Sequence, residues 1–121
     1  MAERAIRVGL VGLGTIGTGV VRALQSHGTL IAERLGFPLE LARIADVDLE
    51  RERGVDLGGY RLSRDWREIV DDPSIDLIVE LVGGTGVARE LVLAALDAGK
   101  HVVTANKALL AKHGREVFAL A

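Results

Sequence analysis

The chain has no cysteine among its 121 residues, and this absence excludes several kinds of chemistry. Disulfide bonds, thiolate metal sites and a cysteine nucleophile are not available to it. The three histidines lack the spacing of metal ligands, so we expect no metal site. The N-terminal segment also lacks the charged, apolar and cleavable regions of a signal peptide. Together these absences lead us to expect a cytoplasmic protein.

Aromatic residues and long apolar runs are scarce as well. The chain has one tryptophan, one tyrosine and two phenylalanines, which argues against nucleic-acid binding by base stacking. Its 15 basic and 17 acidic residues nearly balance, so charge gives no reason to expect nucleic acid or an anionic membrane as a partner. No stretch approaches the roughly 20 apolar residues of a membrane-spanning helix. The core must therefore consist of Val, Leu, Ile and Ala, the residues typical of parallel α/β sheets.

Apolar strands that alternate with helical segments make up most of the sequence. We predict strands over residues 4–11, 39–45, 60–62, 75–82 and 101–104. We predict helices over residues 15–26, 29–35, 65–70, 88–98 and 108–121, with His27 and Gly28 interrupting the first helical region and Gly99 ending another. Alternating strands and helices imply right-handed crossovers and therefore a parallel sheet. The expected fold class is α/β, a doubly wound parallel sheet in three layers.

A glycine pattern lies between the first strand and the first helix. Gly12, Gly14 and Gly17 have the spacing G-x-G-x-x-G in the strand–turn–helix context of a dinucleotide-binding site. Gly12 permits the tight turn, Gly14 lets a pyrophosphate approach the backbone, and Gly17 lets the helix pack on the strand. The helix start offers N–H groups and a positive dipole end to phosphates. The alternative is a glycine-rich turn that binds nothing, but the context favours a Rossmann-type domain.

Four strand ends should meet at one crevice, because ligands of open parallel sheets bind beyond the carboxyl ends of the strands. They are residues 12–17, 46–48, 82–86 and 104–107. Gly83 and Gly84 would let the backbone lie against a nicotinamide ribose, although a turn without a ligand is the alternative. Lys107 follows the last of these strands. A lysine in a closed apolar crevice can transfer protons or hold a substrate oxygen, whereas one that opens a helix can simply be solvated.

Two acids, Asp46 and Asp48, follow the second long strand, with Val47 between them. A carboxylate at this place accepts hydrogen bonds from the adenosine ribose and repels a 2′-phosphate. Arg51 and Arg53 come next, and either could accept a 2′-phosphate or be a solvated loop residue. The predicted cofactor is therefore NAD or NADP, with a slight preference for NAD that is set around Asp46, Val47 and Asp48.

These motifs together resemble the amino-terminal domain of homoserine dehydrogenase. The resemblance covers essentially the whole chain and rests on residues 8–17, 46–49, 80–84 and 99–111, of which the last stretch is the most specific. Members of that family reduce aspartate semialdehyde to homoserine with NADPH or NADH, in the biosynthesis of threonine, methionine and isoleucine. The resemblance implies an oxidoreductase whose intact form acts on this small molecule.

The resemblance also implies roles for particular residues. The pyrophosphate would lie on Gly12, Leu13, Gly14, Thr15, Ile16 and Gly17, and the nicotinamide side would be lined by Val82, Gly83, Gly84 and Thr85. Asn106 would contact the cofactor, and Lys107 would contact cofactor and substrate and move a proton as the catalytic residue. Several family members that use NADP have an arginine where Val47 stands, which weakens the case for a 2′-phosphate contact there.

The sequence ends inside an apolar segment, 118–121, so we expect residues 1–121 to be a dinucleotide-binding domain that a substrate domain follows in a longer chain. The family's second catalytic lysine, substrate-binding acids and monovalent-cation site would lie in that later domain. The present domain should then bind cofactor without turnover, and the intact enzyme is expected to be a homo-oligomer. The alternatives are a stand-alone NAD(H)-sensing module and another Rossmann-type oxidoreductase with a lysine at this strand end.

Overall fold

Five parallel strands form one sheet in the part of the chain that the computed structural model describes, residues 5–82 and 86–104. In chain order the elements are β1 (Ile6–Val11), α1 (Thr15–Leu35), β2 (Leu39–Ala45), β3 (Arg61–Ser63), α2 (Arg67–Val70), β4 (Leu77–Glu80), α3 (Gly86–Asp97) and β5 (His101–Thr104). The strand order is β3-β2-β1-β4-β5, and all neighbouring pairs are parallel. The strands β2 and β3 therefore lie on one side of β1, and the later strands β4 and β5 lie on its other side. The direction of winding reverses between β1 and β4.

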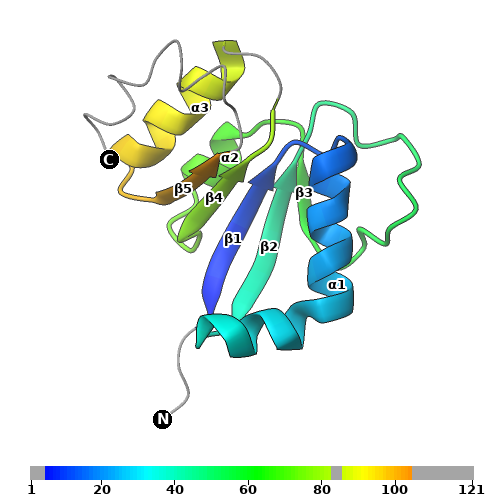
Figure 1. Ribbon diagram of the computed structural model, residues 1–121. Coiled ribbons are helices and arrows are strands. Elements are labelled where there is room, and N and C mark those ends of the chain that lie inside the picture. The colour runs from blue at the N-terminus through cyan, green and yellow to red at the C-terminus, as the bar shows by residue number, and fades with distance from the viewer. Residues whose placement is uncertain (1–4, 83–85, 105–121) are drawn as a thin grey trace.

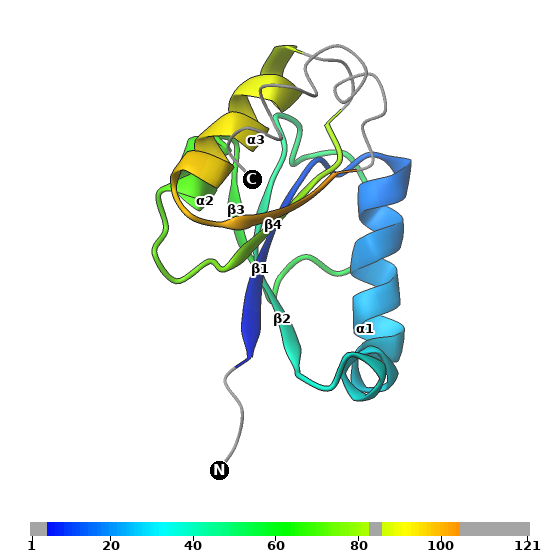
Figure 2. The same cartoon turned by 60° about the vertical axis from the view of Figure 1, so that its left-hand side comes forward.

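Helices cover both faces of this sheet: α1 lies on one face, and α2 and α3 lie on the other (Figures 1 and 2). Each face has its own apolar core. Leu10 packs with Val21 and Ile44 on the α1 side, whereas Val11 packs with Ile69 on the opposite side. Because successive residues of a strand point to opposite faces, the two neighbours Leu10 and Val11 each serve a different core. The predicted α/β, doubly wound, three-layer fold is confirmed.

Helix α1 changes direction at His27, where the sequence predicts an interruption (Figure 1). The backbone of His27 is not helical, with φ −130° and ψ 19°. The helix resumes and ends at Leu35, where Gly36 adopts a left-handed conformation with φ 83°. The N–H of Gly36 donates to the Ala32 carbonyl at 2.9 Å and satisfies one of the final carbonyls of the helix.

Some element bounds differ from the sequence-based expectation. β4 is shorter than the expected strand over residues 75–82, because Ile75 belongs to the preceding turn and donates its N–H to the Asp72 carbonyl at 3.1 Å. α2 begins two residues later than the expected helix over 65–70, and the Asp65 carboxylate accepts the N–H of Arg67 at 3.0 Å. The expected helix over 108–121 lies outside the described residues.

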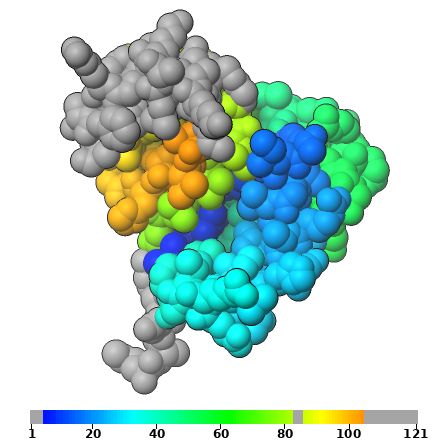
Figure 3. All heavy atoms as spheres, in the orientation of Figure 1, coloured from blue at the N-terminus to red at the C-terminus, as the bar shows by residue number. Residues whose placement is uncertain are grey.

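The segment between β2 and β3 packs against α1, and the two form one continuous flank of the molecule (Figure 3). Its apolar side chains, Leu49, Val55, Leu57 and Tyr60, lie against the α1-side core. Gln25 of α1 donates to the Asp56 carbonyl at 2.7 Å and to the Tyr60 hydroxyl at 3.0 Å. These contacts hold the segment against α1, although it has no regular secondary structure.

A polar network holds the turn that leads into β4. Arg43, whose side chain is 8% exposed, donates to the Asp72 carboxylate at 3.2 Å and to the Glu68 carbonyl at 3.0 Å. The ammonium group of Lys100 donates to the carbonyls of Asp72 and Ile75, both at 2.7 Å. Asp72 also accepts hydrogen bonds from the Ser74 N–H and hydroxyl, at 2.8 and 2.7 Å. The network thus connects β2, α2, β4 and β5.

We expect Asp72→Asn to lower the free energy of unfolding at pH 7 by roughly 1 kcal/mol, because charge-assisted hydrogen bonds are lost. The Ser74 hydroxyl, then the Ser74 N–H and Arg43, hold the pKa of Asp72 below its ordinary value of 3.8. A lowered carboxyl pKa stabilises the fold above the unfolded pKa, and this contribution is lost as the pH falls through the folded pKa. Chemical denaturation from pH 7 to 3 should therefore show the difference shrinking on acidification.

The adjacent Asp71→Asn, on an exposed side chain, is the matched control for this measurement. Equal stability of Asp72→Asn and the parent at pH 7, or a difference independent of pH, would contradict the assignment.

Candidate functional site

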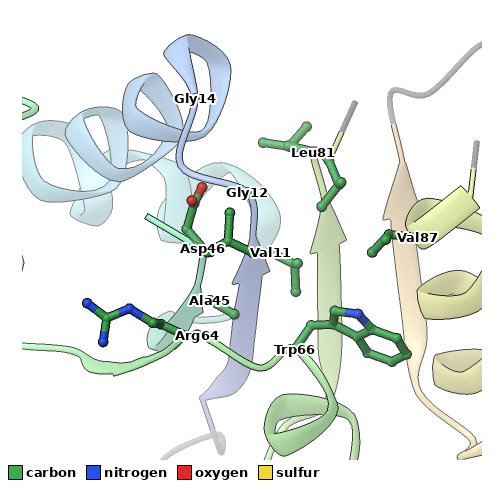
Figure 4. A pocket seen from close by; sticks show the side chains of 11 residues that line it. Val11, Gly12, Gly14, Ala45, Asp46, Arg64, Trp66, Leu81 and Val87 are labelled. Atoms are coloured by element: carbon green, nitrogen blue, oxygen red, sulfur yellow. The ribbon is translucent and has the colours of Figure 1, made fainter. Parts of the chain in front are cut away.

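A pocket of about 430 Å³ lies beyond the carboxyl ends of the strands (Figure 4). It is lined by Val11, Gly12, Gly14, Ala45, Asp46, Val47, Arg64, Trp66, Leu81, Val82 and Val87. The lining is mostly apolar, and the charged groups are those of Asp46 and Arg64. Figure 4 shows Asp46 pointing toward the turn that contains Gly12 and Gly14, while the Trp66 ring extends toward Val87. A concave, apolar site with a few polar groups suits part of a cofactor-sized ligand.

Two of the three glycines of the turn are required by close packing. Gly12 has φ 107°, and a Cβ there would lie 2.8 Å from the Leu81 carbonyl group. A Cβ on Gly17 would overlap the Gly12 carbonyl oxygen. Packing alone therefore demands glycine at positions 12 and 17.

Gly14 differs from both. It has an ordinary extended backbone, with φ −73°, and a Cβ there would have no packing contact within 4 Å among the described residues. Gly14 is exposed and lines the pocket. No packing contact among the described residues therefore demands a glycine at position 14, where it serves as the N-cap of α1, and the open space beside it can admit a ligand that lies against the backbone. This free space fits a pyrophosphate.

The start of α1 is also open to an anion. Gly14 is the N-cap residue, no side chain caps the helix, and its first turn carries no acidic residue. Thr15 and Ile16 are exposed, with Ile16 66% accessible. Unpaired N–H groups and the positive end of the helix dipole favour phosphate at this place.

Asp46 connects the loops that follow β1 and β2. One carboxylate oxygen accepts the Leu13 N–H at 2.6 Å, and the other accepts the Asp48 N–H at 2.8 Å. Its side chain is 18% exposed, and a carboxylate has lone pairs for further donors such as ribose hydroxyls. Asp48 is exposed; its carboxylate accepts the N–H of Glu50 and then that of Arg51, which lower the pKa of Asp48.

Arg53 fits neither of the two interpretations that the sequence offers for it. Its side chain is only 3% exposed, so it is not a solvated loop residue. Its guanidinium donates to the Leu13 carbonyl at 2.9 Å, to the Arg51 carbonyl at 3.0 Å and to the Asp48 carbonyl, so it is not free to take a 2′-phosphate. Arg51 is exposed and donates to the same Leu13 carbonyl at 3.3 Å.

Arg64 and Trp66 are pocket residues that the sequence reasoning missed. They follow β3, a strand of three residues, whose carboxyl end lies at the same edge of the sheet as those of β1 and β2. Arg64 pairs with Glu50 at 2.7 Å on the surface, and the Arg67 guanidinium lies 4.5 Å from the centre of the Trp66 ring. The available signal was their position directly after a parallel strand.

A buried carboxylate, Glu80, joins the ends of β4 and β5. It is fully buried, accepts the Val82 N–H at 2.9 Å and also accepts the Thr104 hydroxyl hydrogen. Val82 lines the pocket, and its place on the nicotinamide side stays a prediction. The other residues expected on that side, Gly83, Gly84, Thr85, Asn106 and Lys107, lie outside the described residues.

Residues 5–82 and 86–104 contain no group of three or more His, Asp and Glu side chains that could hold a metal ion. Among the same residues, no helix has the length and apolar character needed to cross a bilayer.

The fold and the glycine turn define a dinucleotide-binding domain of the Rossmann type. The sequence profile of the family described as "Homoserine dehydrogenase, NAD binding domain" matches residues 12–121. The chain belongs to this family, and its cofactor is accordingly NAD or NADP.

Known relatives agree with this assignment. The chain is 42% identical to homoserine dehydrogenase of Bacillus subtilis over 116 residues, and 51% identical to that of Methylobacillus glycogenes over 108 residues. These matches cover 96% and 89% of this chain but only 27% and 26% of the relatives, so the chain spans about a quarter of their length.

Solved structures give the same result. A crystal structure of a homoserine dehydrogenase from Thiobacillus denitrificans matches with a TM-score of 0.91 at 45% identity, covering 99% of this chain and 28% of that one. The Staphylococcus aureus homoserine dehydrogenase matches with a TM-score of 0.87 at 36% identity, covering 98% of this chain and 30% of that one.

The different reasons for the glycines can be separated by substitution. We expect Gly14→Val to keep the fold, with a loss of about 1 kcal/mol or less from the weaker N-cap. Its side chain should nevertheless weaken NAD(H) binding about tenfold or more, because it occupies the place of the pyrophosphate. Gly17→Ala should instead lower the free energy of unfolding by at least about 2 kcal/mol, because its Cβ overlaps the Gly12 carbonyl.

Thermal unfolding and calorimetric titration of both variants check this pair of expectations. A folded Gly14→Val variant that binds the cofactor as well as the parent would show that the pyrophosphate does not lie there.

Proposed function

We propose that this chain is the cofactor-binding domain, residues 1–121, of a longer enzyme that reduces aspartate semialdehyde to homoserine with NADH or NADPH. The observation that carries the proposal is Gly14, which no packing contact among the described residues demands and which lines the pocket where a pyrophosphate would occupy the place of a side chain. Membership of the homoserine dehydrogenase family supports the reaction. The greater length of the relatives supports a substrate domain elsewhere in the intact protein.

The described residues supply the adenosine half of this site. The pyrophosphate lies on the turn and first helical residues, Gly12, Leu13, Gly14, Thr15, Ile16 and Gly17. The adenosine ribose donates hydrogen bonds to Asp46, and the adenine ring packs on the apolar lining near Ala45, Trp66 and Val87. Asp46 is held in place for this by its bonds to the two loop N–H groups.

The nicotinamide half carries the chemistry. The reduced nicotinamide, when bound, supplies a hydride for the aldehyde carbon. Lys107 gives a proton to the aldehyde oxygen, which becomes the hydroxyl group of homoserine. Val82, Gly83, Gly84 and Thr85 line this side of the cofactor, and Asn106 contacts it. These roles rest on the family resemblance. The fully buried Glu80 links the ends of β4 and β5, which precede these residues, by accepting hydrogen bonds from the Val82 N–H and the Thr104 hydroxyl.

The arrangement of charges around the ribose favours NAD over NADP. Asp46 and Asp48 lie where a 2′-phosphate would be repelled, and Arg53 is committed to backbone carbonyls. Val47, which is 84% exposed, provides no positive charge at this place. By the same resemblance, the intact enzyme is cytoplasmic and homo-oligomeric, and it acts on a small molecule without nucleic acid or membrane as a partner.

Calorimetry of this chain with NAD(H) and NADP(H) tests the binding function directly. We expect binding of both, with NADH at least as tight as NADPH. A dissociation constant for NADPH tenfold below that for NADH, which is about 1.4 kcal/mol, would overturn the preference. Absence of binding to all four nucleotides would overturn the proposed binding function itself.

The catalytic part of the proposal is tested in the intact protein by Lys107→Met. Methionine keeps most of the apolar stem but removes the charge and all donors. We expect an almost unchanged melting temperature and a fall in kcat/KM of about 10²-fold or more, the lower range for a positioned proton-transfer group.

Lys112→Met, in the same segment of the sequence, is the matched control and should retain turnover. Near-parental activity of a folded Lys107→Met enzyme would remove Lys107 from the active site.

A further inference from the structure

The carbonyl of Leu13, in the middle of the glycine turn, receives an unusual set of donors. It accepts hydrogen bonds from the Nε–H of Arg53 at 2.9 Å, from Arg51 at 3.3 Å and from the Thr18 hydroxyl at 3.3 Å. Two of these donors come from the irregular segment after β2, about 40 residues further along the chain. The turn is therefore held by side chains from outside its own motif.

This contact fixes the direction of the next N–H group. The described residues contain no cis peptide bond. In a planar trans peptide the carbonyl and the following N–H point in opposite directions. Since the Leu13 carbonyl is drawn toward the buried Arg53 guanidinium, the Gly14 N–H points to the other side. Gly14 is exposed and lines the pocket.

The peptide on the other side of Leu13 is fixed as well. Asp46 accepts the Leu13 N–H at 2.6 Å, and the Leu13 side chain is fully buried. Arg53 and Asp46 also attract each other, with a closest N–O distance of 3.9 Å. Two groups of opposite charge thus hold two consecutive peptides of the turn, one by its N–H and the other by its carbonyl.

We propose that Arg53 is a positioning residue for cofactor binding: it orients the Leu13–Gly14 peptide so that the Gly14 N–H is directed at the pyrophosphate before the cofactor arrives. This inference rests on the proposed function. A donor that is already oriented binds without an ordering cost at the moment of association, and this raises affinity. Arg53 itself makes no contact with the cofactor, because its side chain is only 3% exposed and each of its three guanidinium nitrogens donates to a backbone carbonyl.

The test compares Arg53→Gln and Arg53→Lys with the parent chain, with Arg34→Gln as the control for loss of one positive charge. Arg34 is exposed in the last turn of α1. ADP, which carries the pyrophosphate, and adenosine, which does not, are titrated against each variant. We expect Arg53→Gln to weaken ADP binding about tenfold or more and adenosine binding less than about twofold, and Arg53→Lys to recover only part of the ADP affinity.

A purely structural role predicts a different pattern, in which ADP and adenosine affinities fall together with the melting temperature. That pattern, or unchanged ADP binding by a folded Arg53→Gln variant, would overturn the inference while leaving the proposed function intact. Failure of the parent to bind ADP and every dinucleotide would overturn the proposed function and the inference with it.

If the variants do not fold, NMR of the parent chain tests the positioning role of Arg53. In proton–nitrogen NMR spectra, the Nε–H of Arg53 should exchange slowly with water, unlike that of Arg34. The Arg53 Nε–H and the Gly14 amide should both shift on addition of ADP and stay unchanged with adenosine. Fast exchange of the Arg53 Nε–H, or shifts of equal size with both ligands, would contradict the positioning role.

Discussion

The contact of backbone with backbone at the end of β1 is the constraint on which the site depends. The start of α1 lies so close to the Gly12 carbonyl that a side chain at Gly17 would overlap it. Gly12 also lies close to the Leu81 backbone, just beyond β4. Three segments therefore meet in a volume that side chains would otherwise fill. This places the amino end of α1 at the point where the winding of the sheet reverses, and the pocket opens there.

Closeness alone does not determine how the peptides of such a turn are oriented. Beyond the strand ends, the ladder no longer satisfies the backbone groups, so side chains or water must do so. Asp46 and Arg53 satisfy those of Leu13, and Thr18 adds a third partner from α1. The glycines thus fix the path of the chain through the turn, and the neighbouring charged residues fix the directions of its donors and acceptors.

Local patterns in the sequence were sufficient for most of the fold. Apolar runs locate the long strands, the His27-Gly28 pair locates the bend in α1, and Gly99 marks the end of α3 with φ 79°. These features are predictable because each depends on residues that are close in sequence. The glycine spacing likewise identifies the turn, because its three glycines lie within six residues of chain, 12–17.

The parts of the site that sequence reasoning missed depend on contacts between distant residues. Arg53 lies in a segment without periodicity, and its partner Leu13 is 40 positions away. The sequence does not tell a buried arginine from a solvated one in such a segment. Arg64 and Trp66 follow β3, which has only three residues. Such a short strand shows no periodic pattern, so the sequence does not indicate that its end meets the other strand ends at the pocket.

The double engagement of Asp46 has a consequence for how cofactor choice can evolve or be engineered. Its carboxylate is already part of the turn, through the Leu13 and Asp48 N–H groups, before any ribose is present. In the proposed binding mode, a substitution that removes the charge to admit a 2′-phosphate would also release the turn on which the pyrophosphate would lie. The side chain of Val47 does not hold the turn in this way, since it lines the pocket and is 84% exposed. If the ribose binds as proposed, selectivity between the two dinucleotides can therefore change at position 47, while the hydrogen bonds within the loop keep position 46 fixed.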